Sequence, residues 1–156
     1  MKEFDYKIDY KKIDFKKPEN RRLYRIGRGE QGVLLVRPYT DSICKFWRFK
    51  TPDTARRSAN KIYKMFESYK RKGDFIGMDM CRKFLEMGFT RARRYANHKD
   101  GKKYNPDGSI KPQESDALTC AKALSATIFK NMRDLAAYDE KYQMMRKQWR
   151  DNENEI

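Results

Sequence analysis

The stretch DFIGMDMCRKFLEMGFTRARRYANH, residues 74–98, repeats apolar residues at the spacing of a single helical face. Intervals of three and four residues return a side chain to the same side of an α-helix. Asp74 suits the N-cap, because its carboxylate accepts a hydrogen bond from the free N–H groups of the first turn. Gly88 is tolerated inside the helix only where tight packing requires it. The predicted face consists of Gly77, Cys81, Phe84, Leu85, Gly88, Ala92 and Tyr95.

A second helix is predicted immediately before this one, so that residues 51–98 hold two helices. Thr51 suits the N-cap, Pro52 suits the first helical position, and Asp53 complements the helix dipole. Gly73 is placed to end the helix. The apolar face between these limits consists of Ala55, Ala59, Ile62, Phe66 and Tyr69.

The pattern changes twice after residue 98. Residues 99–114 contain Asp100-Gly101 and Pro106-Asp107-Gly108, which are turn sequences and predict a loop. Residues 115–151 then predict one long C-terminal helix. Its apolar stripe consists of Leu118, Ala121, Leu124, Ile128, Met132, Leu135, Tyr142, Met145 and Trp149.

Residues 1–50 are predicted to be rich in β-structure. Phe4, Tyr6, Ile8 and Tyr10 alternate with charged residues, a pattern typical of a half-buried strand. We therefore expect residues 1–156 to form a single α+β domain, in which a small N-terminal antiparallel sheet precedes three helices, the last of them long. Further short strands are expected at 23–26, 33–37 and 43–49.

The formal net charge is +15, and the first two thirds of the chain supply all of the excess. Residues 1–50 hold 14 Lys and Arg against 7 Asp and Glu, residues 51–104 hold 15 against 6, and residues 105–156 hold 8 against 9. Such a field attracts phosphate backbones and acidic surfaces. The charge therefore favours a polyanionic partner.

Cysteine usage and hydropathy favour a cytoplasmic protein. The three cysteines are far apart and form no Cys-x-x-Cys, which is typical of reduced intracellular thiols. The longest aliphatic run, at 33–36, is far too short to span a bilayer, and the N-terminus has no apolar signal segment. We expect no membrane association.

Basic and aromatic residues are interleaved in FTRARRYANHKDGKKY, residues 89–104. The helix dipole explains two or three cations at a helix end, but the basic residues here continue beyond it. Clustered cations among aromatic rings are typical of nucleic-acid binding. The expected phosphate contacts are Arg91, Arg94, His98, Lys99, Lys102 and Lys103, with Tyr95 and Tyr104 stacking or packing beside them.

A glycine-rich segment, GRGEQG at 27–32, is a secondary anion-binding candidate. It matches the text of a phosphate loop, but an expected strand follows it where a dinucleotide fold needs a helix. The favoured interpretation is a glycine turn between two strands. The alternative is a nest of backbone amides around Gly29 that binds phosphate with the help of Arg25 and Arg28.

A second basic and aromatic patch lies at WRFK, residues 47–50, next to the predicted helix start. Arg56 and Arg57 fall in the first turn of that helix, where cations oppose the dipole unless an anion binds there. Arg48 would join them in contacting the anion. The favoured interpretation, however, places Trp47 and Phe49 in the core, with the cations reaching into water.

No motif in the chain dictates a reaction. Asp79 and Glu86 can share a helical face, but salt bridges to Arg82 or Lys83 explain acids among bases more simply than a magnesium nuclease does. One histidine does not make a histidine-based zinc site, and a cysteine on an apolar face is usually a core residue. We therefore expect no catalytic residue, no metal and no cofactor.

Three segments carry a resemblance to a known family: YRIGRGEQGVLLVRPY at 24–39, WRF at 47–49, and GDFIGMDMCRKFLEMGFTRARRYANHKDGKKY at 73–104. Together they resemble an uncharacterised domain-of-unknown-function family associated with marine T4-like cyanophages and with some bacteria and fungi. The resemblance implies a self-contained intracellular domain. It assigns no activity to any residue.

The sequence thus favours a basic intracellular domain that binds nucleic acid or another polyanion without catalysis. Two alternatives stay open. One is a small enzyme acting on a phosphorylated or nucleotide substrate, built around GRGEQG, His98 and the acids of the helix at 74–98. The other is an adaptor that binds an acidic protein surface.

Overall fold

Two adjacent helices form where the capping and periodicity signals agree. Helix α3 spans Pro52–Lys72; the Thr51 side chain accepts from the N–H of Thr54, and Gly73 ends the helix with a φ of 68°. Helix α4 spans Phe75–Asn97, and the Asp74 carboxylate accepts from the N–H of Gly77. The predicted N-caps of both helices are confirmed.

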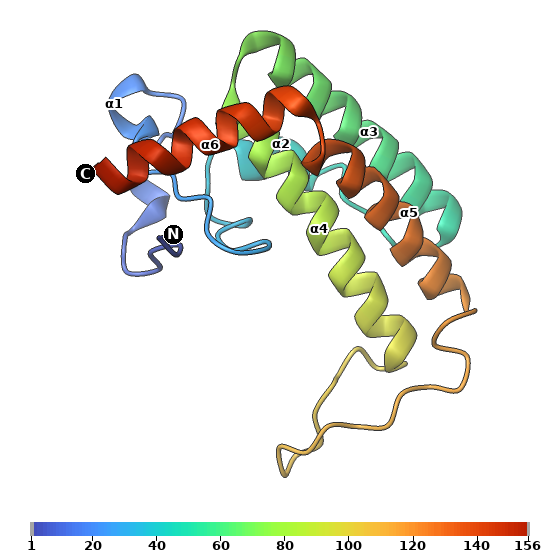
Figure 1. The fold of residues 1–156 in the computed structure, drawn as a ribbon. Coiled ribbons are helices and arrows are strands. Elements are labelled where there is room, and N and C mark those ends of the chain that lie inside the picture. The colour runs from blue at the N-terminus through green and yellow to red at the C-terminus, as the bar shows by residue number, and fades with distance from the viewer. Residues whose placement is uncertain (1, 156) are drawn as a thin grey trace.

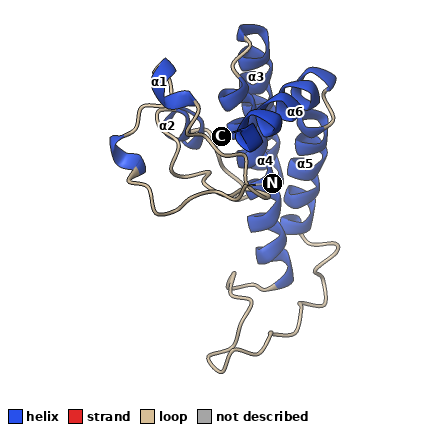
Figure 2. Cartoon of the chain, turned by 60° about the vertical axis from the view of Figure 1, so that its left-hand side comes forward, coloured by secondary structure: helices blue, strands red, loops and turns tan. Residues whose placement is uncertain are grey.

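The computed structural model describes residues 2–155, and within them it contains helices and loops but no strand (Figures 1 and 2). The expected α+β class, with its N-terminal sheet, is therefore wrong. Besides α3 and α4, the elements are a 3-10 helix η1 (Tyr10–Lys12) and the α-helices α1 (Pro18–Arg21), α2 (Tyr39–Cys44), α5 (Ala121–Ala137) and α6 (Glu140–Glu155).

Helix α4 is the centre of the fold. Helices α3 and α5 run beside it and pack against it and each other (Figure 1). Helix α6 and the N-terminal segment, residues 2–38, cover much of the remaining surface of α4. Every residue of 75–85 except Arg82 is therefore buried. The helix that carries the most regular pattern in the sequence is thus the one that the others surround.

Two glycines of α4 allow this close packing. A Cβ on Gly77 would lie 2.3 Å from the ring of Tyr69 on α3, and a Cβ on Gly88 would lie 2.3 Å from the ring of Phe129 on α5. Both distances are far below van der Waals contact. Packing against Phe129 therefore requires glycine at position 88, although glycine inside a helix is less favourable than alanine.

The alternation near the N-terminus reflects local turns. Asp5 accepts from the N–H of Lys7, and Asp9 accepts from the N–H of Lys11 at the start of η1. Aspartates that bond the backbone two residues later stabilise turns. The rings of Phe4 and Tyr10 still reach the core, as a strand would have allowed.

The other expected strands are also wrong, because side chains satisfy their backbone groups. The N–H of Val36 donates to the Thr40 hydroxyl, which in turn donates to the carbonyl of Val33. The N–H of Ile26 donates to Glu153. A backbone whose polar groups are paired in this way needs no neighbouring strand. The last expected strand, at 43–49, contains the end of α2 and a turn.

The expected long helix at 115–151 is two helices. Residues 115–120 form turns, and the chain bends at Tyr138 and Asp139 between α5 and α6. The Asp139 carboxylate accepts from the N–H of Tyr142 at 2.9 Å and forms an ion pair with Lys70 on α3. An aspartate that caps a new helix and is tied to another helix redirects the chain.

Residues 98–120 form an irregular loop that extends away from the helices (Figures 1 and 2). An isolated bridge joins Tyr104 to Ile110, and Lys111 forms an ion pair with Asp100 at 2.8 Å. The loop predicted at 99–114 therefore has a small hairpin-like closure within it.

We predict that Gly88→Ala lowers the free energy of unfolding by about 1–3 kcal/mol, because the added methyl group overpacks the contact with Phe129. Chemical denaturation measures this change. The double variant Gly88→Ala/Phe129→Leu should lose less stability than the two single changes combined, since the smaller side chain makes room. Strict additivity, or a stabilised Gly88→Ala protein, would contradict the packing argument.

Candidate functional site

A fully buried carboxylate, Asp79, lies where α4, α6 and the N-terminal segment meet. Its Oδ1 accepts from the Tyr142 hydroxyl at 2.5 Å and from Arg82 Nη2 at 2.8 Å, and its Oδ2 accepts from the Tyr24 hydroxyl. Burial alone would raise the pKa of this carboxyl, but the charges of Arg82 and Lys83 and the two hydroxyl donors lower it to about 2. Asp79 is therefore ionised at neutral pH.

Lys83, one helical turn further on, is also fully buried. Its Nζ donates to the carbonyl of Gln31 at 2.7 Å and to that of Arg25 at 3.3 Å, and it lies 3.9 Å from Asp79 Oδ2. The Nζ also stands 4.8 Å from the ring centre of Tyr24. Burial lowers the pKa of Lys83 to about 7, although Asp79 acts in the opposite direction. These contacts fasten the glycine-rich segment to α4.

Helix α6 is fixed to the same N-terminal backbone. Trp149 Nε1 donates to the carbonyl of Tyr24 at 3.0 Å, and Arg150 Nη2 donates to that of Gly27 at 2.9 Å. Glu153 accepts from the N–H of Ile26 at 3.3 Å. Helix α6 therefore crosses from α5 to the N-terminal segment, as Figure 1 shows.

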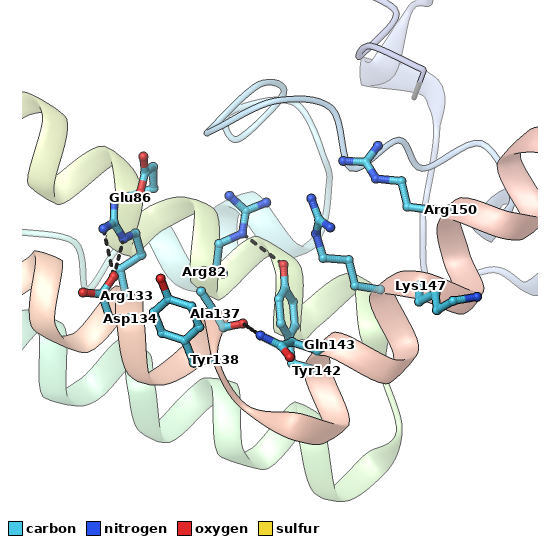
Figure 3. A pocket seen from close by; sticks show the side chains of 11 residues that line it. Arg82, Glu86, Arg133, Asp134, Ala137, Tyr138, Tyr142, Gln143, Lys147 and Arg150 are labelled. Carbon is cyan, nitrogen blue, oxygen red and sulfur yellow. Dashed lines mark hydrogen bonds and ion pairs between the residues drawn. The ribbon is translucent and has the colours of Figure 1, made fainter.

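An open pocket of about 630 Å³ lies beside this network, between α4, α5 and α6 (Figure 3). Glu86 and Asp134 are the acidic residues that line it, and Tyr138 and Tyr142 contribute aromatic rings. Because basic groups outnumber acidic ones in the lining, the pocket is a candidate for an anionic ligand. Its basic lining residues are Arg82, Arg133, Arg146, Lys147 and Arg150. We call it the arginine pocket.

The basic residues expected near the end of α4 separate into two hollows. Arg94, His98 and Lys103 line one of about 280 Å³, whose lining contains no carboxylate. Arg91 lines another of about 450 Å³, together with Arg28. Of the expected phosphate contacts, Arg91 therefore lies apart from Arg94 and His98.

The exposure of these residues also differs. Arg91, Arg94, Lys99 and Lys102 are exposed, and Lys103 is half-buried. His98 lines its hollow but is only 5% exposed, so little of its ring is accessible to a ligand. Tyr104 is exposed on the loop, while Tyr95 packs against Phe49.

A third hollow, of about 260 Å³, lies at the start of α3 and is lined by four cations and no carboxylate. The ring of Phe46 lies among them, 5.3 Å from Lys45 Nζ and 4.7 Å from Lys61 Nζ. The Ser58 hydroxyl accepts from the N–H of Arg48 and donates to the Phe46 carbonyl, which fixes this segment against α3. We call it the α3 basic hollow; its cations are Lys45, Arg48, Arg57 and Lys61.

The structure thus brings together two of the three secondary candidates in this region. Arg48 and Arg57 share the α3 basic hollow. Arg56 instead pairs with Asp53 at 3.0 Å and does not line the hollow. Trp47 and Phe49 pack against the core, as the favoured interpretation of this segment predicts.

The start of α3 and the end of α4 lie at the same end of the helical bundle (Figure 1). The rings of Phe49 and Tyr95 are 6.0 Å apart, and Lys122 Nζ lies 5.2 Å from the centre of the Phe49 ring. Lys122 also donates to the carbonyl of Lys50 at 2.8 Å. Burial and the charge of Lys50 both lower the pKa of Lys122. Positive charge is therefore crowded where the two regions meet.

The segment GRGEQG forms consecutive turns, and its expected strand–loop–strand setting is wrong. The N–H of Arg28 donates to the Gln31 side chain, and the N–H of Gly32 donates to the Tyr6 hydroxyl. The Gly29 carbonyl accepts from Arg82 Nη1 at 2.6 Å. The amides of Arg28 and Gly32 are therefore already bonded within the protein, and a phosphate nest around Gly29 stays a prediction. Arg28 itself is exposed and pairs with Glu3 at 3.2 Å.

Sequence reasoning missed the buried network and the arginine pocket. It did predict the pairing of Asp79 with Arg82 or Lys83, which is confirmed. The overlooked signal is the position of these charges, at spacings of three and four within the most apolar part of α4. Tyr24 and Tyr142, the other partners, lie too far away in the chain for a local pattern to reveal them.

Among the described side chains, those of residues 2–153, no three from His, Cys, Asp or Glu gather as they would around a metal ion. No helix in this range is long and apolar enough to cross a membrane. The three cysteines are free thiols, and that of Cys81 is buried.

Comparison with known proteins gives a family match. The family model described as "Domain of unknown function (DUF4385)" matches residues 5–152. Neither the curated proteins nor the solved structures provide a match.

We predict that the stability of the wild-type protein rises with pH relative to that of Lys83→Met between pH 7 and 9. Lys83 has a pKa of about 7 when folded, below its ordinary value of 10.5. In this window the unfolded chain therefore binds a proton that the folded chain lacks, so raising the pH favours folding by up to about 1.4 kcal/mol per pH unit. Below pH 7 the difference should be flat.

Urea denaturation of both proteins at pH 6, 7, 8 and 9 gives the free energy of unfolding of each. Subtracting the value for Lys83→Met from that of the wild type at each pH cancels the contribution of the tyrosines and cysteines, which titrate in both proteins. The same pH dependence in both proteins would mean that buried Lys83 keeps its proton throughout.

Proposed function

We propose that this chain, which belongs to the family of the domain of unknown function DUF4385, binds nucleic acid through its phosphate backbone. The proposed surface joins the α3 basic hollow to the basic residues at the end of α4. No base-specific contact and no catalytic step are part of the proposal.

The observation that carries it is the α3 basic hollow. Four cations from two segments converge on a lining without a carboxylate. Neighbouring cations repel one another, and a chain of phosphates relieves this repulsion while releasing its own counterions. The Phe46 ring also lines this hollow and adds an aromatic surface of the kind on which bases stack.

The end of α4 extends this surface. Arg94 and Lys103 line a second hollow without a carboxylate, and Lys99 and Lys102 are exposed on the following loop. The acids nearby are already paired: Asp53 with Arg56, and Asp100 with Lys111. The remaining cations at this end of the bundle therefore keep their charge available for a ligand.

The proposal places this binding in the cytoplasm, and in the cytoplasm of a host cell if the chain is encoded by a phage. An acidic protein surface is the rival partner, since it offers negative charge without stacking faces or regular phosphate spacing.

We predict that Arg57→Gln/Lys61→Gln weakens binding to single- and double-stranded oligonucleotides of any sequence. The slope of log K against log salt should fall by about 2 for duplex DNA, because two phosphate contacts are lost. Fluorescence anisotropy of labelled oligonucleotides at several salt concentrations measures both quantities. The matched control is Arg71→Gln/Lys72→Gln, which removes the same charge from exposed positions at the other end of α3.

The control variant should keep most of the wild-type affinity for oligonucleotides and most of the wild-type slope of log K against log salt. Equal losses in the two double variants would reduce the effect to net charge and would contradict the assigned surface. Absence of binding by the wild-type protein near physiological salt would reject the proposed function and favour the acidic protein partner.

A further inference from the structure

The arginine pocket is separate from the surface proposed for nucleic acid. It lies at the junction of α4, α5 and α6, and none of its lining residues lines the α3 basic hollow. In Figure 3, Arg133 and Glu86 stand at one end of the pocket, Arg150 stands at the other, and Arg82 lies between them.

Two arginines of this pocket are held in place by the protein. Arg82 is fixed by Asp79 and by the carbonyl of Gly29. Arg133 donates to Glu86 at 2.6 Å and to Asp134 at 2.8 Å. Guanidinium groups that are already ordered lose little conformational entropy when a ligand binds.

The end of the pocket on α6 carries positive charge that is not fully compensated. Arg146 has no ion-pair partner among the described side chains. Arg150 Nη1 forms an ion pair with Glu153 Oε2 at 3.6 Å, but this nitrogen is buried and makes no hydrogen bond. Burial and the charge of Arg146 lower the pKa of Arg150. A bound anion would compensate the charge of Arg146 and relieve its repulsion with Arg150.

An aromatic ring stands at the edge of the same pocket. Tyr138, at the bend between α5 and α6, is 72% exposed and lines the pocket. Large exposed rings beside ordered guanidinium groups offer a stacking face next to a phosphate site. The exposed Tyr138 has no role in the core that would account for an aromatic side chain at this position.

We propose that the arginine pocket binds a nucleoside phosphate. Its phosphates lie between Arg146, Arg150 and Arg82, and its base stacks on Tyr138. The pocket volume of about 630 Å³ lies within the range of small-molecule sites. This inference does not depend on the proposed binding of nucleic acid.

Isothermal titration with ADP, inorganic pyrophosphate and adenosine tests the proposal. ADP should bind saturably to one site and more tightly than pyrophosphate. Arg146→Gln should weaken both ligands about tenfold, because each loses a charge-assisted hydrogen bond. Tyr138→Ala should weaken ADP about tenfold through the loss of stacking and leave pyrophosphate within about twofold. Tyr138 is exposed and Arg146 is half-buried, so both variants should fold.

The matched control for charge is Lys130→Gln, an exposed position on α5 outside the pocket, which should change neither affinity by more than about twofold. ADP binding should also survive in Arg57→Gln/Lys61→Gln, which separates this site from the nucleic-acid surface. No saturable ADP binding, equal losses in Arg146→Gln and Lys130→Gln, or equal affinity for ADP and pyrophosphate would overturn the proposal.

Discussion

The buried carboxylate of Asp79 is the constraint on which the rest of the structure depends. An ionised group without water is tolerated only when it is paired and hydrogen-bonded, and Asp79 meets this requirement with partners from three parts of the chain. Tyr24 comes from the N-terminal segment, Arg82 from α4 itself, and Tyr142 from α6. Satisfying one carboxylate therefore fixes how these three parts are joined.

This joining explains how a segment with so little regular structure is held in place. Lys83 and Glu153 bond backbone groups between Arg25 and Gln31, and Arg150 bonds the carbonyl of Gly27. These side chains perform the function that a neighbouring strand has in a sheet. The same anchoring holds α6 across α4, which places its arginines at the edge of the arginine pocket.

Elements specified by local signals were predictable from the sequence. The caps at Thr51 and Asp74 and the periodicity of α3 and α4 act within a few residues, so the sequence alone located both helices. The basic residues at 48, 57, 94 and 103 are clustered in the sequence and also line hollows in the structure. The sequence predicts α5 and α6 as one helix because the apolar stripe continues past Asp139. In the structure the helix is interrupted there, since the Asp139 carboxylate caps α6 and pairs with Lys70.

What the sequence could not reveal depends on partners far apart in the chain. Alternating aromatic and charged residues at 4–10 satisfy the pattern of a strand, but their aspartates cap turns. The partner of the Ile26 amide, Glu153, lies 127 residues away. The arginine pocket likewise combines Arg82, Arg133 and Arg146 from three helices, so no single stretch of sequence contains it.

The most direct test of this account is hydrogen exchange, measured by mass spectrometry, on Asp79→Asn beside the exposed control Asp53→Asn. The account predicts faster exchange in α6 and in residues 24–36 of the Asp79→Asn protein, with α3 and α5 still protected. The control should exchange as the wild type does. Unchanged exchange in α6 and 24–36, or an equal loss of protection along the whole chain, would contradict the claim that Asp79 joins these parts.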